Sequence, residues 1–237
     1  MSTALVTGGS RGIGRAVCAA LAAAGYDVLF SYSKDEEGAK QTLRLIEEAG
    51  AGGTAVRCDV SDEAQVRALF AAAPGLEVLV NNAGVSSFGL LQDTSLSEWR
   101  RVFSVNTEGA FLCMREAIPK LLRRGGGCIV NVSSVWGEAG ASCEAAYSAS
   151  KAALIGLSKA AAKELAPAGI RVNCVSCGMI DTQMNARLSD EARAQFCAKQ
   201  PIAREGTPEE VAAAVLFLVR SRYITGEVLR VDGGALL

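Results

Sequence analysis

The sequence lacks histidine entirely: its 237 residues include 24 lysines and arginines and 25 aspartates and glutamates, but no histidine. Histidine is the general base of Ser-His-Asp hydrolases and of the histidine-based dehydrogenases. Its absence therefore excludes both classes. Any general acid in this chain must be a tyrosine, lysine, cysteine, aspartate or glutamate.

Strong net charge and long apolar runs are also missing. The formal net charge is −1, which provides no basic surface for a polyanion, so we expect no nucleic-acid partner. No apolar run is long enough to span a bilayer, so we expect no membrane association. The first strand-like segment starts at Ala4 and leaves no room for a signal peptide. We therefore expect a cytoplasmic protein.

The eight cysteines are scattered through segments that have the pattern of core strands and helices, which favours free thiols over disulfides. Cys174 and Cys177 have the spacing of a redox or zinc pair. A structural zinc site needs four ligands, and the sequence has neither a second such pair nor a histidine. We therefore expect no metal site.

Strand-like and helix-like segments alternate along the whole chain, which predicts a single α/β domain over residues 1–237. Half of the residues are hydrophobic, enough to bury a parallel sheet under helices on both faces. The first two strands are predicted at residues 4–6 and 28–32, separated by a helix that ends near Ala24. The third and fourth are predicted at residues 55–60 and 78–84.

A glycine-rich turn with the spacing G-x-x-x-G-x-G lies between the first strand and the first helix. Gly8 permits the tight turn, Gly12 lets the backbone approach a pyrophosphate, and Gly14 lets the helix pack closely on the strand. A strand, a glycine turn and a helix in this order predict a dinucleotide-binding site. The other predicted cofactor contacts in this turn are Ser10, Arg11 and Ile13.

The end of the second strand predicts which dinucleotide binds. NAD-binding proteins place an acidic residue there for the ribose 2′-hydroxyl, whereas NADP-binding proteins omit it and supply cations. Here Tyr32, Ser33 and Lys34 follow, and Lys34 together with Arg11 can pair with a 2′-phosphate. The sequence therefore predicts NADP(H), unless the strand continues to the acidic residues at positions 35 and 36.

Two further strand ends complete the predicted cofactor site, because ligands bind beyond the carboxyl ends of parallel strands. Asp59, followed by Val60, ends the third strand and is expected at the adenine, and Ser61 is expected to cap the next helix. The fourth strand ends in small and polar residues that we expect along the cofactor: Asn81, Asn82, Ala83 and Gly84.

Tyr147 and Lys151 are the strongest catalytic signal. Four residues apart on a helix, they lie on one face, a turn from each other. A free tyrosine has a pKa of about 10, and a neighbouring ammonium stabilises the phenolate and lowers that pKa toward neutrality. The hydroxyl of Ser134, from another element, can hold a substrate oxygen against the phenol. Together these residues predict proton transfer to or from a carbonyl or alcohol.

These residues together resemble the classical short-chain dehydrogenase/reductases over essentially the whole chain. The matching segments, in order, are Thr7 to Gly14, Asn81 to Gly84, Asn106, Ser134, Tyr147 with Lys151, and Val231 to Gly234. The resemblance implies a Rossmann-type, doubly wound parallel sheet of seven strands with helices on both faces. It also implies a homotetramer, for which the alanine-rich helix after Tyr147 suits a subunit interface.

The resemblance implies a mechanism as well. Hydride passes from the nicotinamide to a ketone carbon while Tyr147 protonates the oxygen. Lys151 lowers the pKa of the tyrosine and binds the nicotinamide ribose, Ser134 orients the carbonyl, and Asn106 holds a water in the proton relay. We expect Ser133 to be structural, because adjacent strand residues face opposite ways.

One segment departs from the family pattern. The sixth strand of the family usually continues into Pro-Gly, but here Cys177 stands at the proline position, close to the expected nicotinamide. We interpret it as a tolerated small residue rather than a redox switch. The following residues still match the segment that contacts the nicotinamide end of the cofactor: Gly178, Ile180 and Thr182. Residues 179–204 have the polar helical pattern of a mobile lid, whose substrate-covering residues would be Met184, Leu188 and Phe196.

Overall the chain is most similar to 3-oxoacyl-[acyl-carrier-protein] reductases, which use NADPH to reduce a β-ketoacyl group tethered to a carrier protein. A carrier protein is acidic and needs a basic docking surface, of which Arg123 and Arg124 can form part. Two arginines found in such reductases are absent, because the segment from Val85 to Phe88 contains none and Ala168 occupies the second position.

A narrower resemblance leads to a different substrate. Ser133 to Gly137 and Gly140 to Glu144 look like the bacterial reductases that reduce the 5-aminopentanone modification of a lysine on elongation factor P. Trp136 and Glu144 flank the catalytic tyrosine, and an aromatic face with a carboxylate suits a cationic alkyl-lysine. A non-catalytic NADP(H) sensor on the same fold is a third reading, which the complete catalytic set disfavours.

Overall fold

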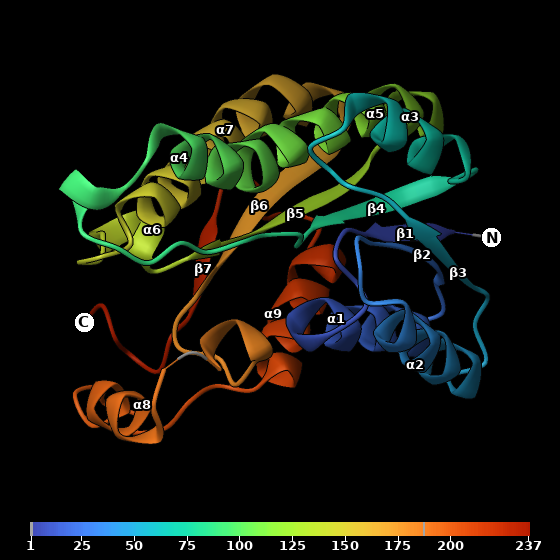
Figure 1. The fold of residues 1–237 in the computed structure, drawn as a ribbon. Coiled ribbons are helices and arrows are strands. Elements are labelled where there is room, and N and C mark those ends of the chain that lie inside the picture. Colours follow the sequence, from blue (N-terminus) through green and yellow to red (C-terminus); the bar gives the residue numbers. More distant parts are fainter. Residues whose placement is uncertain (1, 187) are drawn as a thin grey trace.

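Seven parallel strands form the central layer of the molecule (Figure 1). The computed structural model describes residues 2–186 and 188–237. The sheet order is β3-β2-β1-β4-β5-β6-β7, and every neighbouring pair is parallel. The strands are β1 Thr3–Val6, β2 Asp27–Tyr32, β3 Gly53–Arg57, β4 Leu76–Asn81, β5 Gly127–Ser134, β6 Ile170–Cys177 and β7 Val228–Val231. This is the doubly wound seven-stranded sheet that the family resemblance implied.

Helices cover both faces of the sheet (Figure 1). The lower layer in the figure contains α1 Gly12–Ala23, α2 Glu36–Glu48 and α9 Pro208–Arg220. The upper layer contains α3 Glu63–Ala71, α4 Leu96–Phe103, α5 Gly109–Arg124 and α7 Ala145–Leu165. Two short helices, α6 Trp136–Ala139 and α8 Asp190–Cys197, lie on the side where the strands end. No helix in the described part of the chain is long and apolar enough to cross a bilayer.

The central strands are apolar along their length because both of their faces are covered. Val6 packs with Phe30 in the layer that α1 and α9 cover, whereas its neighbour Leu5 packs with Leu79 in the layer under α3, α5 and α7. Burying such a side chain contributes about 1.5–3 kcal/mol. These two layers therefore hold the helices on the sheet and keep the strand ends in fixed positions.

Two local predictions near β3 are wrong. The predicted strand reached residue 60, but β3 ends at Arg57, because Tyr32 is the last residue of β2 and pairs with Arg57. The predicted cap at Ser61 is replaced by Asp62, whose carboxylate accepts hydrogen bonds from two main-chain N–H groups at the start of α3. A carboxylate that satisfies two free N–H groups is the stronger cap.

The strand order reverses between β1 and β4, so connections leave the sheet in opposite directions from these two neighbours. Such a point leaves a crevice outside the carboxyl ends of the strands, where ligands of doubly wound folds bind. The glycine turn follows β1, and the Asn82–Gly84 segment follows β4. The fold therefore brings both predicted cofactor segments to the same crevice.

Candidate active site

The glycine turn has the backbone conformation that its glycines suggested. Gly8 and Gly12 have φ angles of +69° and +51°, in the left-handed region that side chains disfavour. A Cβ atom at Gly14 would lie 2.1 Å from the carbonyl oxygen of Gly8. Helix α1 can therefore start directly against the turn only because position 14 has no side chain.

The turn is braced by the end of β4. The side-chain amide of Asn82 donates hydrogen bonds to the carbonyl oxygens of Thr7 and Gly8, at 2.9 and 3.0 Å. In return, the hydroxyl of Thr7 accepts from the main-chain N–H groups of Asn82 and Ala83, both at 3.0 Å. The sequence predicted Asn82 as a cofactor contact, whereas the structure shows its side chain shaping the turn that would hold the cofactor.

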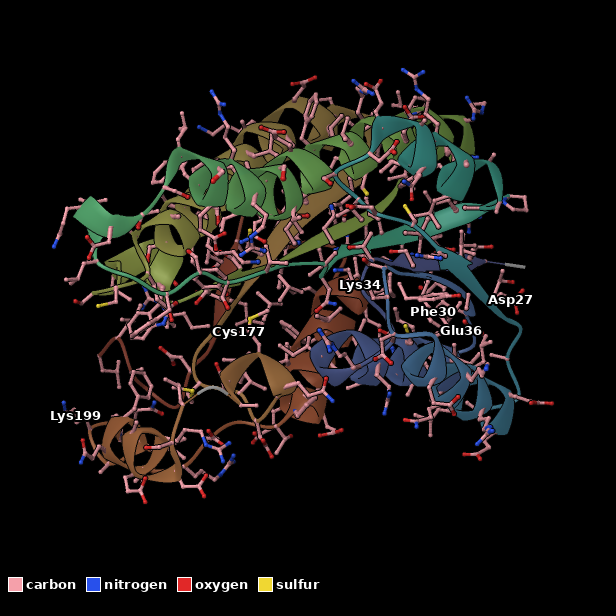
Figure 2. The ribbon with its side chains drawn as sticks, viewed as in Figure 1. Asp27, Phe30, Lys34, Glu36, Cys177 and Lys199 are labelled. Atoms are coloured by element: carbon pink, nitrogen blue, oxygen red, sulfur yellow. The ribbon has the colours of Figure 1, made fainter. Side chains whose placement is uncertain are left out.

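The end of β2 itself carries no acidic residue, and the first carboxylate after it, that of Asp35, caps α2. The strand ends at Tyr32, as predicted, and the side chain of Asp35 caps α2 by accepting a hydrogen bond from the Gly38 N–H at 2.9 Å. Figure 2 shows Lys34 beyond this end of β2 and Asp27 at the other end of the same strand. Lys34 is exposed, and so is Arg11 in the glycine turn.

Arg11 has a contact that the sequence did not indicate. Its guanidinium donates to the side-chain oxygen of Gln183 at 2.8 Å, 172 residues further along the chain. A Cβ atom at Gly12 would lie 3.3 Å from the Thr182 side chain, so the segment predicted as a lid begins directly on the glycine turn.

Asp59 and Val60, the residues predicted to contact the adenine, both have partners within the protein. The Asp59 carboxylate accepts from both the main chain and the hydroxyl of Ser61, at 3.0 and 2.7 Å. Val60 is buried, and its side chain packs against Gly109, where an added Cβ would lie 2.8 Å from it. Contact between Val60 and a cofactor would therefore have to use its main chain.

The three residues predicted to carry the chemistry line a single pocket. Ser134 is the last residue of β5, while Tyr147 and Lys151 project from α7 one turn apart. The Lys151 Nζ lies 5.8 Å from the centre of the Tyr147 ring. All three side chains are at least nine-tenths buried, so their charges and hydroxyl groups act on one another in a medium of low polarity.

Lys151 is held on β5. Its Nζ donates a hydrogen bond to the carbonyl oxygen of Val132 at 2.8 Å. Burial disfavours the charged ammonium and lowers the pKa of Lys151 to about 8. Lys151 therefore gains and loses its proton closer to neutral pH than a free lysine does.

Asn106 lies in a π-helical turn, Ser104–Glu108, between α4 and α5. Its side-chain oxygen accepts from the Val85 N–H at 2.8 Å, and its amide nitrogen donates to the Val85 carbonyl at 2.9 Å and to the Ser150 hydroxyl at 3.0 Å. The amide therefore joins the loop after β4 to α7. A Cβ atom on neighbouring Gly84 would lie 3.4 Å from the Asn106 oxygen and 3.5 Å from the Lys151 Nζ.

Two consecutive serines at the end of β5 have different partners. The Ser133 hydroxyl donates to the main-chain oxygen of Lys151 at 3.1 Å, which is a structural contact. The Ser134 hydroxyl oxygen accepts from the Trp136 N–H at 3.2 Å. This bond uses the oxygen of Ser134 as acceptor and orients the residue at the pocket.

Cys177 ends β6, pairs in register with Ser134 and lines the same pocket. Figure 2 shows it between the sheet and the α8 segment. Burial raises the pKa of its thiol to about 12, although the Lys151 charge acts in the opposite direction. At neutral pH the group is therefore a neutral thiol with low nucleophilicity.

The eight cysteines are free thiols, as predicted. Cys174 and Cys177 lie three residues apart in one strand, so their side chains point to opposite faces of the sheet and cannot form a disulfide or share a metal ion. Among the described residues, no group of three or more potential ligands is placed to hold a metal.

The segment predicted as a lid closes one side of the pocket. It contains a short 3-10 turn, Gln183–Asn185, and helix α8, while position 187 lies outside the described residues. The ring of Trp136 meets Phe196 of α8 edge-on, with centroids 5.5 Å apart. The pocket is lined by the predicted substrate residues Trp136, Glu144, Met184, Leu188 and Phe196, and by the predicted cofactor residues Ile13, Asn82, Gly84, Gly178, Ile180 and Thr182.

Two features of the surroundings were not anticipated. Cys143, directly before Glu144, has a φ of +63°, and its carbonyl oxygen accepts from the Gly89 N–H at 2.8 Å. The predicted docking arginines lie at the amino end of β5, opposite the pocket, and Arg124 there pairs with Glu77. Within one chain, Arg123 and Arg124 are therefore remote from the catalytic residues.

Comparison with known proteins places this site in a family. The family model described as enoyl-(acyl carrier protein) reductase matches residues 8–235. The 3-oxoacyl-[acyl-carrier-protein] reductase of Staphylococcus aureus is 41% identical over 238 residues, covering 98% of this chain and 97% of that protein. The reductase of the same name from Aquifex aeolicus is 39% identical, covering 97% and 95%.

Solved structures agree with this relationship. A short-chain dehydrogenase/reductase variant from Serratia marcescens has a TM-score of 0.94 at 35% identity, covering all of this chain and 98% of the other. A protein from Sinorhizobium meliloti described as a short-chain alcohol dehydrogenase has a TM-score of 0.94 at 34% identity, covering 99% and 96%. Both likenesses extend over the strands, the glycine turn and the pocket. The chain therefore belongs to the short-chain dehydrogenase/reductase family of oxidoreductases.

Proposed function

We propose that the protein is an NADPH-dependent reductase that converts a β-ketoacyl group to a 3-hydroxyacyl group, with Tyr147 as the acid. One observation carries the proposal: Ser134, Tyr147 and Lys151 line a common pocket at the carboxyl ends of the strands, next to the glycine turn. The two curated relatives described above are named 3-oxoacyl-[acyl-carrier-protein] reductases, which supports a β-ketoacyl substrate tethered to a carrier protein.

The residues around the glycine turn fit a dinucleotide. Gly8 and Gly12 adopt left-handed backbones there, and α1 begins directly after the turn. The N-terminus of a helix presents main-chain N–H groups and a positive dipole end to a phosphate. The turn, the N-terminus of α1 and the Asn82 brace would therefore hold the pyrophosphate, and Gly178, Ile180 and Thr182 would line the nicotinamide end.

The surroundings of β2 favour NADP(H) over NAD(H). The nearest carboxylate along the chain, Asp35, lies three residues beyond the end of β2 and caps α2 by accepting from the Gly38 N–H. Exposed Lys34 and Arg11 supply two cations for a 2′-phosphate. Arg11 would exchange its hydrogen bond to Gln183 for that phosphate.

In the proposed reaction, Ser134 and Tyr147 hold the carbonyl oxygen of the substrate between two hydroxyl groups. When bound, the nicotinamide supplies the hydride. Tyr147 donates its phenolic proton as negative charge develops on the carbonyl oxygen. The Lys151 ammonium, held by Val132, then stabilises the phenolate that remains.

Asn106 would act in the proton relay through its main chain. Its side-chain oxygen and nitrogen are already bonded to Val85 and Ser150. The π-turn around it removes main-chain carbonyls from the regular helical pattern, and such a carbonyl can accept a water that connects to Lys151.

The lid would open to admit the substrate and then exclude water. The pocket measures about 120 Å³, below the range of about 300–1,000 Å³ that is usual for ligand sites. We therefore propose that the 179–204 segment moves outward during binding, and that the Trp136–Phe196 contact re-forms when it closes.

The direct test is NADPH oxidation by the purified protein with a β-ketobutyryl thioester. We expect turnover by the wild type, and a loss of about 100- to 10,000-fold in kcat for Tyr147→Phe, since general acid catalysis contributes about 10²–10⁴-fold. NADPH binding by Tyr147→Phe, followed by fluorescence, serves as the folding control. Activity retained by that variant would refute Tyr147 as the acid, and a wild type that binds NADPH but reduces no ketone would be the sensor.

A second candidate substrate is the 5-aminopentanone-modified lysine of elongation factor P. The observation in its favour is that Trp136 and Glu144 line the catalytic pocket, which offers an aromatic face and a carboxylate to a cation. Neither curated relative described above is named for that activity. Turnover of the modified factor, with none of the thioester, would select this candidate.

We also propose a cytoplasmic homotetramer. The apolar side chains of Phe111 and Leu122 on α5 are about half exposed, at 45% and 48%, and exposed apolar side chains on one helix support association through it. Sedimentation of the purified protein measures the assembly.

A further inference from the structure

Helix α7 carries both Tyr147 and Lys151, and β5 holds its main chain at the lysine. The Ser133 hydroxyl donates to the Lys151 carbonyl oxygen at 3.1 Å. Ser133 is 2% exposed, so the bond is shielded from water. A hydroxyl from the sheet ties this turn of the helix to a neighbouring element, which the bonds within the helix cannot do.

The far end of the same side chain is tied to the same strand. The Lys151 Nζ donates to the carbonyl oxygen of Val132, the residue directly before Ser133. Helix α6 packs closely against the main chain of Lys151, because a Cβ atom at Gly137 would lie 2.8 Å from the Lys151 carbonyl carbon. Strand β5 therefore anchors both the base and the tip of a side chain that is otherwise long and flexible.

We propose that Ser133 is a positioning residue for the reduction: its hydroxyl fixes the main chain of Lys151 and, through it, the distance from the lysine ammonium to the Tyr147 phenol. The proposal rests on the proposed function, in which that distance governs the stability of the phenolate. Without the hydroxyl, the turn of α7 that carries Tyr147 and the base of Lys151 can shift on β5 while the lysine tip remains bonded to Val132, which changes the distance from the ammonium to the phenol.

Among the titratable groups around Lys151, the coupling between its ammonium and the Tyr147 phenol is the one that a shift of the lysine can change. Tyr147 lies beside it on α7, and the thiols of Cys174 and Cys177 on β6 are the other titratable groups that act on its charge. Burial raises the pKa of these thiols to about 11 and about 12, so they are neutral where the enzyme works. A change in the distance between the Lys151 ammonium and the phenol therefore alters the titration of the phenol.

Three variants test the proposal. Ser133→Ala removes the hydroxyl and Ser133→Thr restores one, while Ser158→Ala is the matched control. Ser158 is also buried: its hydroxyl donates to the Leu154 carbonyl of the same helix at 2.7 Å and accepts from the Asn131 amide of β5 at 2.6 Å, so it ties α7 to the same strand but away from Lys151. The assay is oxidation of a 3-hydroxybutyryl thioester with NADP⁺ from neutral to alkaline pH, together with the melting temperature.

We expect Ser133→Ala to lower kcat about 10- to 100-fold, since small displacements of reacting groups have effects of that size. Its pH profile shifts to higher pH because the phenolate is less stabilised, and Ser133→Thr restores the profile. Ser158→Ala lowers the melting temperature without moving the profile. A Ser133→Ala profile that matches wild type, or one that Ser158→Ala reproduces, would overturn the proposal.

A second measurement separates this inference from the proposed reaction. NMR titration of the Lys151 Nζ in the protein without substrate should show a midpoint that differs from wild type in Ser133→Ala. In Ser158→Ala the midpoint should equal that of wild type. A wild type that oxidises no thioester would refute the function, whereas an unchanged Lys151 titration in Ser133→Ala would refute the positioning role. If Ser133→Ala does not fold, Ser133→Cys keeps a weak donor and is expected to give an intermediate shift.

Discussion

The substitution Gly14→Ala tests the close contact between α1 and the glycine turn. The added Cβ would lie 2.1 Å from the Gly8 carbonyl oxygen and 2.5 Å from the Asn82 side-chain nitrogen, both under the 3.0 Å that real Cβ contacts respect. Either α1 moves away from the turn, or the Asn82 amide gives up its two hydrogen bonds. Both outcomes disturb the proposed pyrophosphate site.

The magnitude follows from these contacts. Overpacking a well-packed site costs about 1–3 kcal/mol, and each lost hydrogen bond costs about 0.5–1.5 kcal/mol. With two bonds lost, the free energy of unfolding falls by roughly 2–6 kcal/mol, out of about 5–15 kcal/mol for a typical protein. At about 2–4 °C per kcal/mol for a domain of this size, the melting temperature falls by roughly 4–24 °C.

The assay is a thermal melt followed by circular dichroism, with and without NADPH. We expect NADPH to raise the melting temperature of wild type and to have little effect on Gly14→Ala. The control is Gly25→Ala, just after α1, where φ is +91° and no atom lies within 4 Å of the added Cβ. It should lose only the left-handed backbone energy of about 1–2 kcal/mol and keep its response to NADPH. A Gly14→Ala variant with the melting temperature and NADPH response of wild type would refute the contact.

Two further predictions concern charge. Because burial lowers the pKa of Lys151 to about 8, against about 10.4 when unfolded, the unfolded state binds more protons between these values, and the free energy of unfolding should rise there by up to about 3 kcal/mol. In urea titrations, Lys151→Met should be more stable than wild type below about pH 8, and its free energy of unfolding should not rise between about pH 8 and about 10.4. If wild type and variant showed the same dependence on pH, the buried ammonium would be contradicted. Lys34→Glu should weaken NADPH binding about 10- to 100-fold, the worth of a charge-assisted hydrogen bond, and leave NADH binding nearly unchanged in fluorescence titrations. Equal losses for both cofactors would remove Lys34 from the 2′-phosphate site.

Local patterns were sufficient to predict an α/β domain and its first four strands, whereas the seven-stranded sheet was implied by the family resemblance. The glycine turn could be identified from sequence because Gly8 and Gly12 occupy left-handed positions set by their own backbone. The end of β2 could be identified because the apolar run stops at Tyr32. β3 could not be bounded, because its end depends on the length of a neighbouring strand.

The same distinction applies to the candidate site. Tyr147 and Lys151 were predicted as a pair because four residues make one helical turn, and the structure places them in one pocket with Ser134. The role of Asn82 could not be predicted, since its partners lie 74 and 75 residues away. The role of the Asn106 amide could not be predicted either, because its bonds to Val85 and Ser150 exist only when three elements meet.

The sequence by itself determined the fold class, the glycine turn and the spacing of the reactive side chains, because each follows from periodicity and from conformational preferences within a few residues. Only the tertiary structure decided which polar groups remain available at the site. Asp35 is engaged at the start of α2, Asn82 at the turn and Ser133 at Lys151. The physical reason is that a buried polar group must find a partner, and the partner is usually supplied by a distant segment that packing brings into contact.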